Sequence, residues 1–329
     1  MSYAHYIKEL GRGAQGARDL ARDEACTLYG AMLDQAVPEL ELGAIIVALR
    51  VKGEAVAEMQ GFLDAIDSRS EKLRLPPGRA RPVVLPSYNG ARKEANLTPL
   101  LALLLQRFRV PVLVHGLLEG YGRVTTGQIF RELGIMPSGT LAQAQQAMDQ
   151  QQLAFVPVSV LNPGLHQLLS LRSRMGIRNS AHSLVKLLNP FAGEALLVAP
   201  ATHPDFIELM RTLLLERDAS GLLLRGTEGE PYANPKRRPR LEMLQAGQST
   251  VLFEAEHESL RALPQLPEGT DAASTAEWTR RVLDKQIPLP QPVANQLACC
   301  LYASGYAADF HQAKAMVAVE ACGATGGGN

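Results

Sequence analysis

Two short apolar runs on either side of one apolar helix, all within residues 81–116, limit the possible folds more than any other feature of this chain. RPVVLP at 81–86 and VPVLVHG at 110–116 have the composition of buried strands, and LTPLLALLLQRF at 97–108 lies between them as a helix. Parallel strands need such a crossover, so the segment predicts an α/β fold with a mainly parallel central sheet. Further apolar runs extend the sheet: AFVPVSV at 154–160, EALLVAP at 194–200 and SGLLLRG at 220–226.

The N-terminal part of the chain has helical periodicity instead. Apolar residues recur at helical spacing through YIKEL, LYGAML and GAIIVALRVKGEAVAEMQGFLDAI, with breaks at 34–38 and 52–54. This pattern predicts a small helical bundle that ends in a Pro- and Gly-rich linker at about 70–80. Helical periodicity returns at 164–188, 275–287 and 293–319, and the glycines at the end predict a flexible tail at 324–329.

Several classes of protein are excluded at this level. No apolar run reaches the roughly 18 residues of a membrane span, because Arg107 and Arg109 interrupt the longest one, so no membrane partner is expected. The N-terminus lacks a basic start followed by an apolar core, which indicates a cytoplasmic protein. The cysteines have neither CxxC nor zinc-finger spacing and are expected to be core thiols: Cys26, Cys299, Cys300 and Cys322.

The formal net charge of zero conceals an uneven distribution of charge along the chain. Residues 1–68 carry six Lys and Arg against eleven Asp and Glu, whereas residues 69–131 carry eleven against three. Residues 165–240 are also basic, with eleven against seven, and residues 241–329 are acidic, with five against ten. The two basic segments could form one positive face for a polyanion, or they could be a solvated surface with local ion pairs.

The loop SYNGARKEAN at 87–96 follows one expected strand and precedes a helix, where α/β folds place ligands and free N–H groups attract phosphate. Arg92 and Lys93 lie near the helix start, where positive charge opposes the helix dipole and an anion would balance it. A plain turn with surface cations explains the same residues. Tyr88 in this loop, and Tyr232 further on, could stack on bases or pack within the protein.

The segment PYANPKRRPRLEML at 231–244 is a stiff basic loop, because its prolines disfavour a helix. Its cations are suited either to phosphate or to pairing with the acidic stretch Glu254, Glu256 and Glu258. The basic residues concerned are Lys236, Arg237, Arg238 and Arg240.

A third basic group lies on RSRMGIR and beyond. Arg174 and Arg178 share a helix face, with Lys186 two turns further on if one helix runs unbroken, and Arg172 lies just before them. These residues could face a groove or be solvated. The seven histidines show no metal-binding spacing, and no catalytic motif is present, so neither a metal nor a cofactor nor a catalytic residue is predicted.

In this order, the segments resemble the anthranilate phosphoribosyltransferase and nucleoside phosphorylase superfamily over nearly the whole chain. The strings PSYNGARKEANLTPLLALLL, RMGIRNSAH and RGTEGEPYANP resemble one branch, the YbiB-type proteins, described as DNA-binding. The resemblance implies a small helical domain of residues 1–72 and about 161–190, and a larger α/β domain of residues 80–160 and about 191–323. It also implies a homodimer formed through the small domains.

The chain departs from the transferases where they bind phosphoribosyl pyrophosphate. Their GTGGD loop corresponds to a stretch that has lost most glycines and the acid, and only two residues of their KHGNR motif remain. These vestigial positions are Ser87, Tyr88, Asn89, Gly90, His115 and Gly116. The side chains of Tyr88 and Asn89 should obstruct a close approach of pyrophosphate. Of the acidic pair that binds magnesium, Glu230 remains, and Arg172 falls where the transferases hold the anthranilate carboxylate.

We therefore expect a non-catalytic homologue that binds nucleic acid through phosphate contacts with little sequence preference. The partner would be DNA, with RNA as an open alternative, and the basic residues of both segments would converge on grooves of a homodimer. One rival is a phosphoribosyltransferase or phosphorylase with an unknown aromatic or nucleobase substrate. Another is a regulatory protein that binds a protein partner.

Overall fold

The computed structural model describes residues 2–13, 16–78, 80–258 and 264–322. The chain divides into two compact units. Unit 1 comprises Met1–Lys72 and Val158–Pro190, and unit 2 comprises Leu73–Pro157 and Phe191–Asn329. The expected tail at 324–329 lies outside the described residues.

Unit 1 is entirely helical where it is described, as the N-terminal periodicity predicted. Helices α2 and α4 pack closely because Gly61 has no side chain: a Cβ there would lie 2.2 Å from the carbonyl oxygen of Arg22. Tyr29 and Phe62 stack between these two helices, with ring centroids 4.5 Å apart. The helices are α1 (Ala4–Leu10), α2 (Arg22–Leu33), α3 (Glu39–Lys52), α4 (Val56–Asp67), α8 (Val158–Leu161), α9 (Pro163–Ser170), α10 (Arg172–Met175), α11 (Ala181–Leu184) and the 3-10 turn η1 (Val185–Leu187).

Unit 2 is built on a seven-stranded sheet of order β3-β2-β1-β4-β5-β6-β7. The first five strands in chain order are parallel, and β6 and β7 join antiparallel at one edge. The α/β fold with a mainly parallel sheet is thus confirmed. The strands are β1 (Val83–Ser87), β2 (Val112–Gly116), β3 (Leu153–Pro157), β4 (Leu196–Ala201), β5 (Gly221–Arg225), β6 (Leu241–Gln245) and β7 (Gln248–Phe253).

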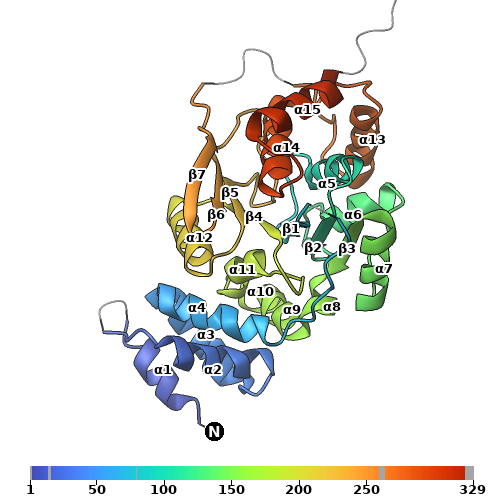
Figure 1. Cartoon of the computed structure of the whole chain (residues 1–329). Helices are drawn as coiled ribbons and strands as arrows, with labels where there is room; N and C mark the ends of the chain where they lie inside the picture. Colours follow the sequence, from blue (N-terminus) through green and yellow to red (C-terminus); the bar gives the residue numbers. More distant parts are fainter. Residues whose placement is uncertain (1, 14–15, 79, 259–263, 323–329) are drawn as a thin grey trace, which may run out of the picture. The chain divides into compact units, whose positions relative to one another are not determined.

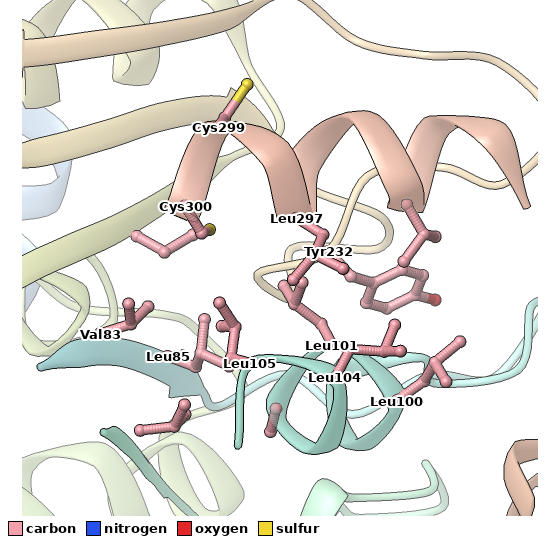
Figure 2. Packing of buried hydrophobic residues seen from close by; sticks show 14 of the residues in the cluster. Val83, Leu85, Leu100, Leu101, Leu104, Leu105, Tyr232, Leu297, Cys299 and Cys300 are labelled. Atoms are coloured by element: carbon pink, nitrogen blue, oxygen red, sulfur yellow. The ribbon is translucent and has the colours of Figure 1, made fainter. Parts of the chain in front are cut away.

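Helices cover both faces of this sheet (Figure 1). The crossover helix α5 packs against β1, β2 and β3, and α12 packs against β4, β5 and β6 on the other face, as right-handed crossovers in opposite directions require. Helix α14 packs on α5, and Figure 2 shows Leu101 and Leu104 of α5 facing Leu297 and Tyr232 in the core. The helices are α5 (Thr98–Arg107), α6 (Thr126–Glu132), α7 (Leu141–Gln151), α12 (Pro204–Glu216), α13 (Ala272–Leu283), α14 (Gln291–Ala303) and α15 (Phe310–Cys322).

Three details differ from the sequence-based prediction. The hairpin of β6 and β7 was not predicted, and β6 includes the end of the segment expected to be a basic loop. Residues 164–188 do not form one helix, because Gly176 adopts φ +70° and ends α10. Residues 293–319 form two helices rather than one.

Two of the four cysteines are core thiols, as expected. Cys299 and Cys300 are buried thiols on α14, and Figure 2 shows the Cys300 side chain turned toward Val83 and Leu85. Cys26 is a half-buried free thiol, and the Cys322 side chain lies outside the described residues. No helix in the described residues has the length and apolar character to cross a membrane.

A phosphate-type cradle filled by two glutamates

The loop after β1 lies where the strand order of the sheet reverses, between β1 and β4. Strand β1 pairs with β2 along its whole length but with β4 only at Val83 and Val84, and the chain leaves β1 and β4 in opposite directions. Open α/β sheets bind ligands at the carboxyl ends of their strands at such a switch point. The loop that follows Ser87 therefore occupies the expected ligand position of this fold.

A tight turn at residues 227–230 faces this loop. Glu228 and Gly229 have φ values of +51° and +90°, and the Glu230 N–H donates to the Thr227 carbonyl at 2.9 Å, which defines a type I′ turn. Glu228 is a non-glycine residue in the left-handed region, which costs on the order of 1 kcal/mol. Gly229 cannot carry a side chain, since a Cβ there would lie 1.7 Å from Asn89 Nδ2. The turn is therefore fitted closely to the loop after β1.

The Glu230 carboxylate is fully buried and lies inside the loop. Its Oε1 accepts hydrogen bonds from the backbone N–H groups of Asn89 at 2.8 Å and Gly90 at 2.9 Å. Its Oε2 is in contact with three side-chain donors: Ser87 Oγ, Thr98 Oγ1 and Asn96 Nδ2. One carboxylate thus satisfies the polar groups that a bound anion would otherwise satisfy.

The Glu228 carboxylate occupies a second set of donors in the same loop. Its Oε1 accepts the backbone N–H groups of Arg92, Lys93 and Glu94 at 3.1, 2.7 and 3.0 Å. Its Oε2 lies 3.2 Å from Arg123 Nη1. Burial tends to raise the pKa of Glu228, but the three backbone donors and the charge of Arg123 outweigh it, so the pKa lies below its usual value. Glu228 is an anion at neutral pH.

Tyr88 of this loop and His115 of β2 form a buried pair. The Tyr88 hydroxyl and His115 Nδ1 share a hydrogen bond, and their rings meet edge to face with centroids 5.3 Å apart. Burial lowers the pKa of His115 to about 3, so the ring is neutral at pH 7. Tyr232 is also buried and donates its hydroxyl to the Ala95 carbonyl at 2.8 Å. Neither tyrosine is available to stack on bases, and the packing interpretation is correct.

Comparison with known proteins places this chain in a family. Residues 4–70 match the family described as "Glycosyl transferase family, helical bundle domain". The chain is 46% identical to protein YbiB of Escherichia coli (strain K12) over 318 residues, which are 96% of this chain and 99% of that protein. The chain belongs to the YbiB family.

This YbiB-family chain is also similar to anthranilate phosphoribosyltransferases. It is 25% identical to the enzyme of Methanosphaerula palustris over 209 residues, which cover 63% of this chain and 61% of the enzyme. The crystal structure of the enzyme from Thermus thermophilus superposes with a TM-score of 0.77 over 96% of this chain and 94% of that chain, at 22% sequence identity. The two proteins share a fold.

The residues present do not fit the phosphoribosyl pyrophosphate and magnesium that the transferase fold implies. Five backbone N–H groups of the loop, those of Asn89, Gly90, Arg92, Lys93 and Glu94, are engaged by glutamates of the chain itself. Within the described ranges, no three His, Cys, Asp or Glu side chains are grouped so that they could hold a metal ion. Glu230 accepts hydrogen bonds from the backbone N–H groups of Asn89 and Gly90 in this YbiB-family chain. The resemblance to the transferases had suggested it as the remnant of a magnesium-binding pair.

The predicted basic residues of unit 2 fall into two sets. The side chains of Arg92 and Lys93 are exposed beside the filled cradle. In the basic loop, Lys236 pairs with Glu94 at 2.9 Å, and Arg240 lies 3.6 Å from Glu242. Arg238 pairs with Glu256 at 3.3 Å and lies over the Phe253 ring, whereas Arg237 is exposed. Pairing with the acidic stretch at 254–258, which the sequence left open, is present for Arg238, whereas Lys236 and Arg240 pair with carboxylates outside that stretch.

The predicted basic residues of unit 1 do not form one row. Arg174 makes a bidentate pair with Glu39 at 3.0 and 3.1 Å, and both side chains are largely exposed. Arg178 is exposed and Arg172 is half-buried. Lys186 is buried in η1, so the idea that it continues an exposed face from Arg178 is wrong. Gly176 ends α10 between Arg174 and Arg178, and α11 begins only at Ala181, so no single helix carries Arg178 and Lys186.

Sequence reasoning missed Glu228. The string TEGE carried a signal, because a Glu-Gly pair between Thr and Glu can form a type I′ turn. Its contact with Lys93 spans 135 residues along the chain, and only the fold brings the two together.

Proposed function

We propose that this chain is a non-catalytic relative of anthranilate phosphoribosyltransferase that binds nucleic acid through phosphate contacts, with little dependence on base sequence. The ligand is DNA, with RNA as the alternative that the same chemistry allows. The observation that carries the proposal is the placement of Arg92 and Lys93. Their side chains are exposed at the ligand edge of the sheet, and within the described residues neither has an ion-pair partner.

The filled cradle supports this choice over the transferase alternative. Glu228 and Glu230 occupy the backbone donors of the loop, so a small phosphorylated substrate finds these N–H groups already bound. The side chains of Arg92 and Lys93 extend from the same loop and remain accessible to the backbone of a longer polyanion. Phosphate contacts of this kind position a nucleic acid without reading its sequence.

The other predicted cations contribute unequally under this proposal. Arg237 in unit 2 and Arg178 in unit 1 are exposed to solvent and are candidates for further phosphate contacts. Surface ion pairs are worth at most about 1 kcal/mol each, so a phosphate can displace the carboxylate partners of the remaining solvent-accessible cations at low cost. Those cations are Arg174, Lys236, Arg238 and Arg240. Arg172 remains a candidate for a phosphate contact, whereas Lys186 is no longer one because it is buried.

We further propose a homodimer formed through helix α3. Leu40, Val47 and Val51 are 83%, 44% and 63% exposed, and their spacing of seven and four residues places them along one side of the helix. An exposed apolar stripe of this kind marks an interaction surface. A symmetric dimer would double the number of phosphate contacts that act together on one nucleic acid.

The direct test is binding of a fluorescently labelled duplex at several salt concentrations. If about five phosphates are contacted, the log–log slope of affinity against salt is roughly −4 to −5. The same series with single-stranded DNA and with RNA identifies the preferred nucleic acid. A slope near zero would mean that phosphate contacts do not carry the binding.

A further inference from the structure

We infer that Glu228 and Glu230 determine specificity: they fill the phosphate cradle of unit 2 from within and thereby exclude small phosphorylated ligands. This inference does not rest on nucleic-acid binding, since it concerns only which anion the loop at residues 87–94 holds. It predicts that the cradle becomes an anion site again when the carboxylate at its mouth is removed.

The backbone N–H donors of the loop are matched by the carboxylate oxygens of Glu228 and Glu230. The loop presents two clusters of backbone N–H groups, one from Asn89 and Gly90 and one from Arg92, Lys93 and Glu94. Successive N–H groups that converge on one point form an anion-binding nest. Each cluster holds one carboxylate oxygen, so the nests are present in the chain but already occupied.

The negative charge of each carboxylate opposes the entry of a phosphate. A phosphate group cannot join a carboxylate in the same nest, because two anions would lie within a few ångströms of each other with poor solvation. It must displace the carboxylate. Displacement of Glu230 would bury an unpaired charge, since its side chain has no access to solvent. Glu228 is the weaker obstacle, because its side chain is partly exposed, at 15%, whereas the Glu230 side chain is fully buried.

The turn that carries Glu228 and Glu230 has a fixed geometry. Glu228 keeps a left-handed backbone, and Gly229 lies against Asn89 too closely for any side chain. The turn at 227–230 is thus held against the loop in the position that directs both carboxylates into the nests. A binding-competent loop needs this arrangement to open, and a site that is open for only a small fraction of the time binds correspondingly weakly.

The experiment compares Glu228→Ala with the wild-type protein in the presence of inorganic pyrophosphate and of phosphoribosyl pyrophosphate, with EDTA to remove divalent metal. Binding is measured by calorimetry and by the shift in Tm, since a ligand that binds only the folded state raises Tm. Glu119→Ala is the matched control: Glu119 is exposed on the loop after β2, and its loss changes the net charge equally while both nests stay filled.

Glu228→Ala is expected to bind pyrophosphate at least about tenfold more tightly than the wild type, the factor that separates an open site from one that is open less than a tenth of the time. Glu119→Ala should behave as the wild type does. If Glu228→Ala does not fold, Glu228→Gln replaces it, because the neutral amide keeps the size of the side chain and should also gain affinity. Equal pyrophosphate affinity in the wild type and the folded variant would overturn the inference, as would an equal gain in Glu119→Ala.

Discussion

The Glu230 carboxylate accepts the backbone N–H of Gly90 at 2.9 Å, in the loop that follows β1. The backbone conformation at Gly90 and the space around it both favour glycine at this position. Gly90 has φ +63°, and a Cβ there would lie 3.0 Å from both the Arg123 side chain and the Val124 carbonyl oxygen. The shape of the loop thus depends on Gly90, and its backbone donors at Asn89 and Gly90 bind an anion of the chain itself, the Glu230 carboxylate.

Gly229→Ala should be strongly destabilising. The new Cβ would overlap Asn89 Nδ2, and alanine is also strained at φ +90°, so a loss of about 3 kcal/mol or more in the free energy of unfolding is expected. Gly122→Ala is the matched control, with φ +81° and open space around the new Cβ, and should cost only about 1 kcal/mol. Urea unfolding measures both. Equal losses would show that the turn is not fitted to the loop as described.

His115 should make the stability of unit 2 depend on pH. Its pKa is about 3 in the folded protein, against an ordinary value of 6.5, so the unfolded state binds the extra proton between these values. Stability contributed by neutral His115 is fully present above pH 6.5 and is lost as pH falls, by about 2 kcal/mol at pH 5. The single tryptophan, Trp278, lies in unit 2 and reports its unfolding by fluorescence.

His115→Asn provides the comparison for that measurement. The variant lacks the titrating ring, so its stability should change by about 2 kcal/mol less than that of the wild type between pH 6.5 and 5. His182, whose pKa burial and nearby cations lower to about 4, lies in unit 1 and is retained in both proteins. Identical pH profiles for the two proteins would mean that His115 is protonated at no cost.

The protein should not form phosphoribosyl anthranilate from anthranilate and phosphoribosyl pyrophosphate with magnesium. The pyrophosphate leaving group needs counter-charge in the transition state, and Glu230, the one residue that the resemblance suggested as a remnant of the metal pair, is bound to backbone N–H groups. A fluorescence assay of product formation tests this. Magnesium-dependent turnover above the rate without enzyme would contradict it.

Val51→Asp should convert the proposed dimer into a monomer. A carboxylate in the apolar stripe of α3 would have to be buried without a partner, which costs several kcal/mol per interface. Val319→Asp on α15 is the matched control, since Val319 is also exposed, at 74%, but lies in the other unit. Sedimentation at micromolar concentration should find the control dimeric. A wild-type monomer of 35.6 kDa would remove the dimer from the account.

The five parallel strands were predictable because each is buried on both faces and reads as a continuous apolar run, as in Val83–Ser87. Strand β7 was not, because Gln248–Phe253 lies at the sheet edge with exposed or half-buried side chains and has no such run. Glycine often ends a helix in the left-handed conformation, as Gly176 does here. The helical periodicity on both sides of Gly176 nevertheless favoured a continuous helix.

The candidate site was predicted only in part. The loop after β1 could be located from the strand that precedes it and the cations within it, as Arg92 and Lys93 show. Its occupants could not, because Glu228 and Glu230 reach it through the tertiary fold, and their backbone partners lie 135 and 141 residues away along the chain. The pairing of Lys236 with Glu94 is equally long-range and was not among the partners that the sequence suggested.

Salt-dependent binding of a labelled duplex by the double variant Arg92→Ala, Lys93→Ala tests whether the exposed cations of the loop after β1 contact phosphates. The variant should bind all sequences more weakly and to the same extent, with a salt slope flattened by about one unit for each phosphate that it no longer binds. The control Lys8→Ala, Arg281→Ala removes two exposed cations elsewhere and should bind as the wild type does. Unchanged affinity and slope in the Arg92 and Lys93 variant, or strong dependence on base sequence, would contradict the account.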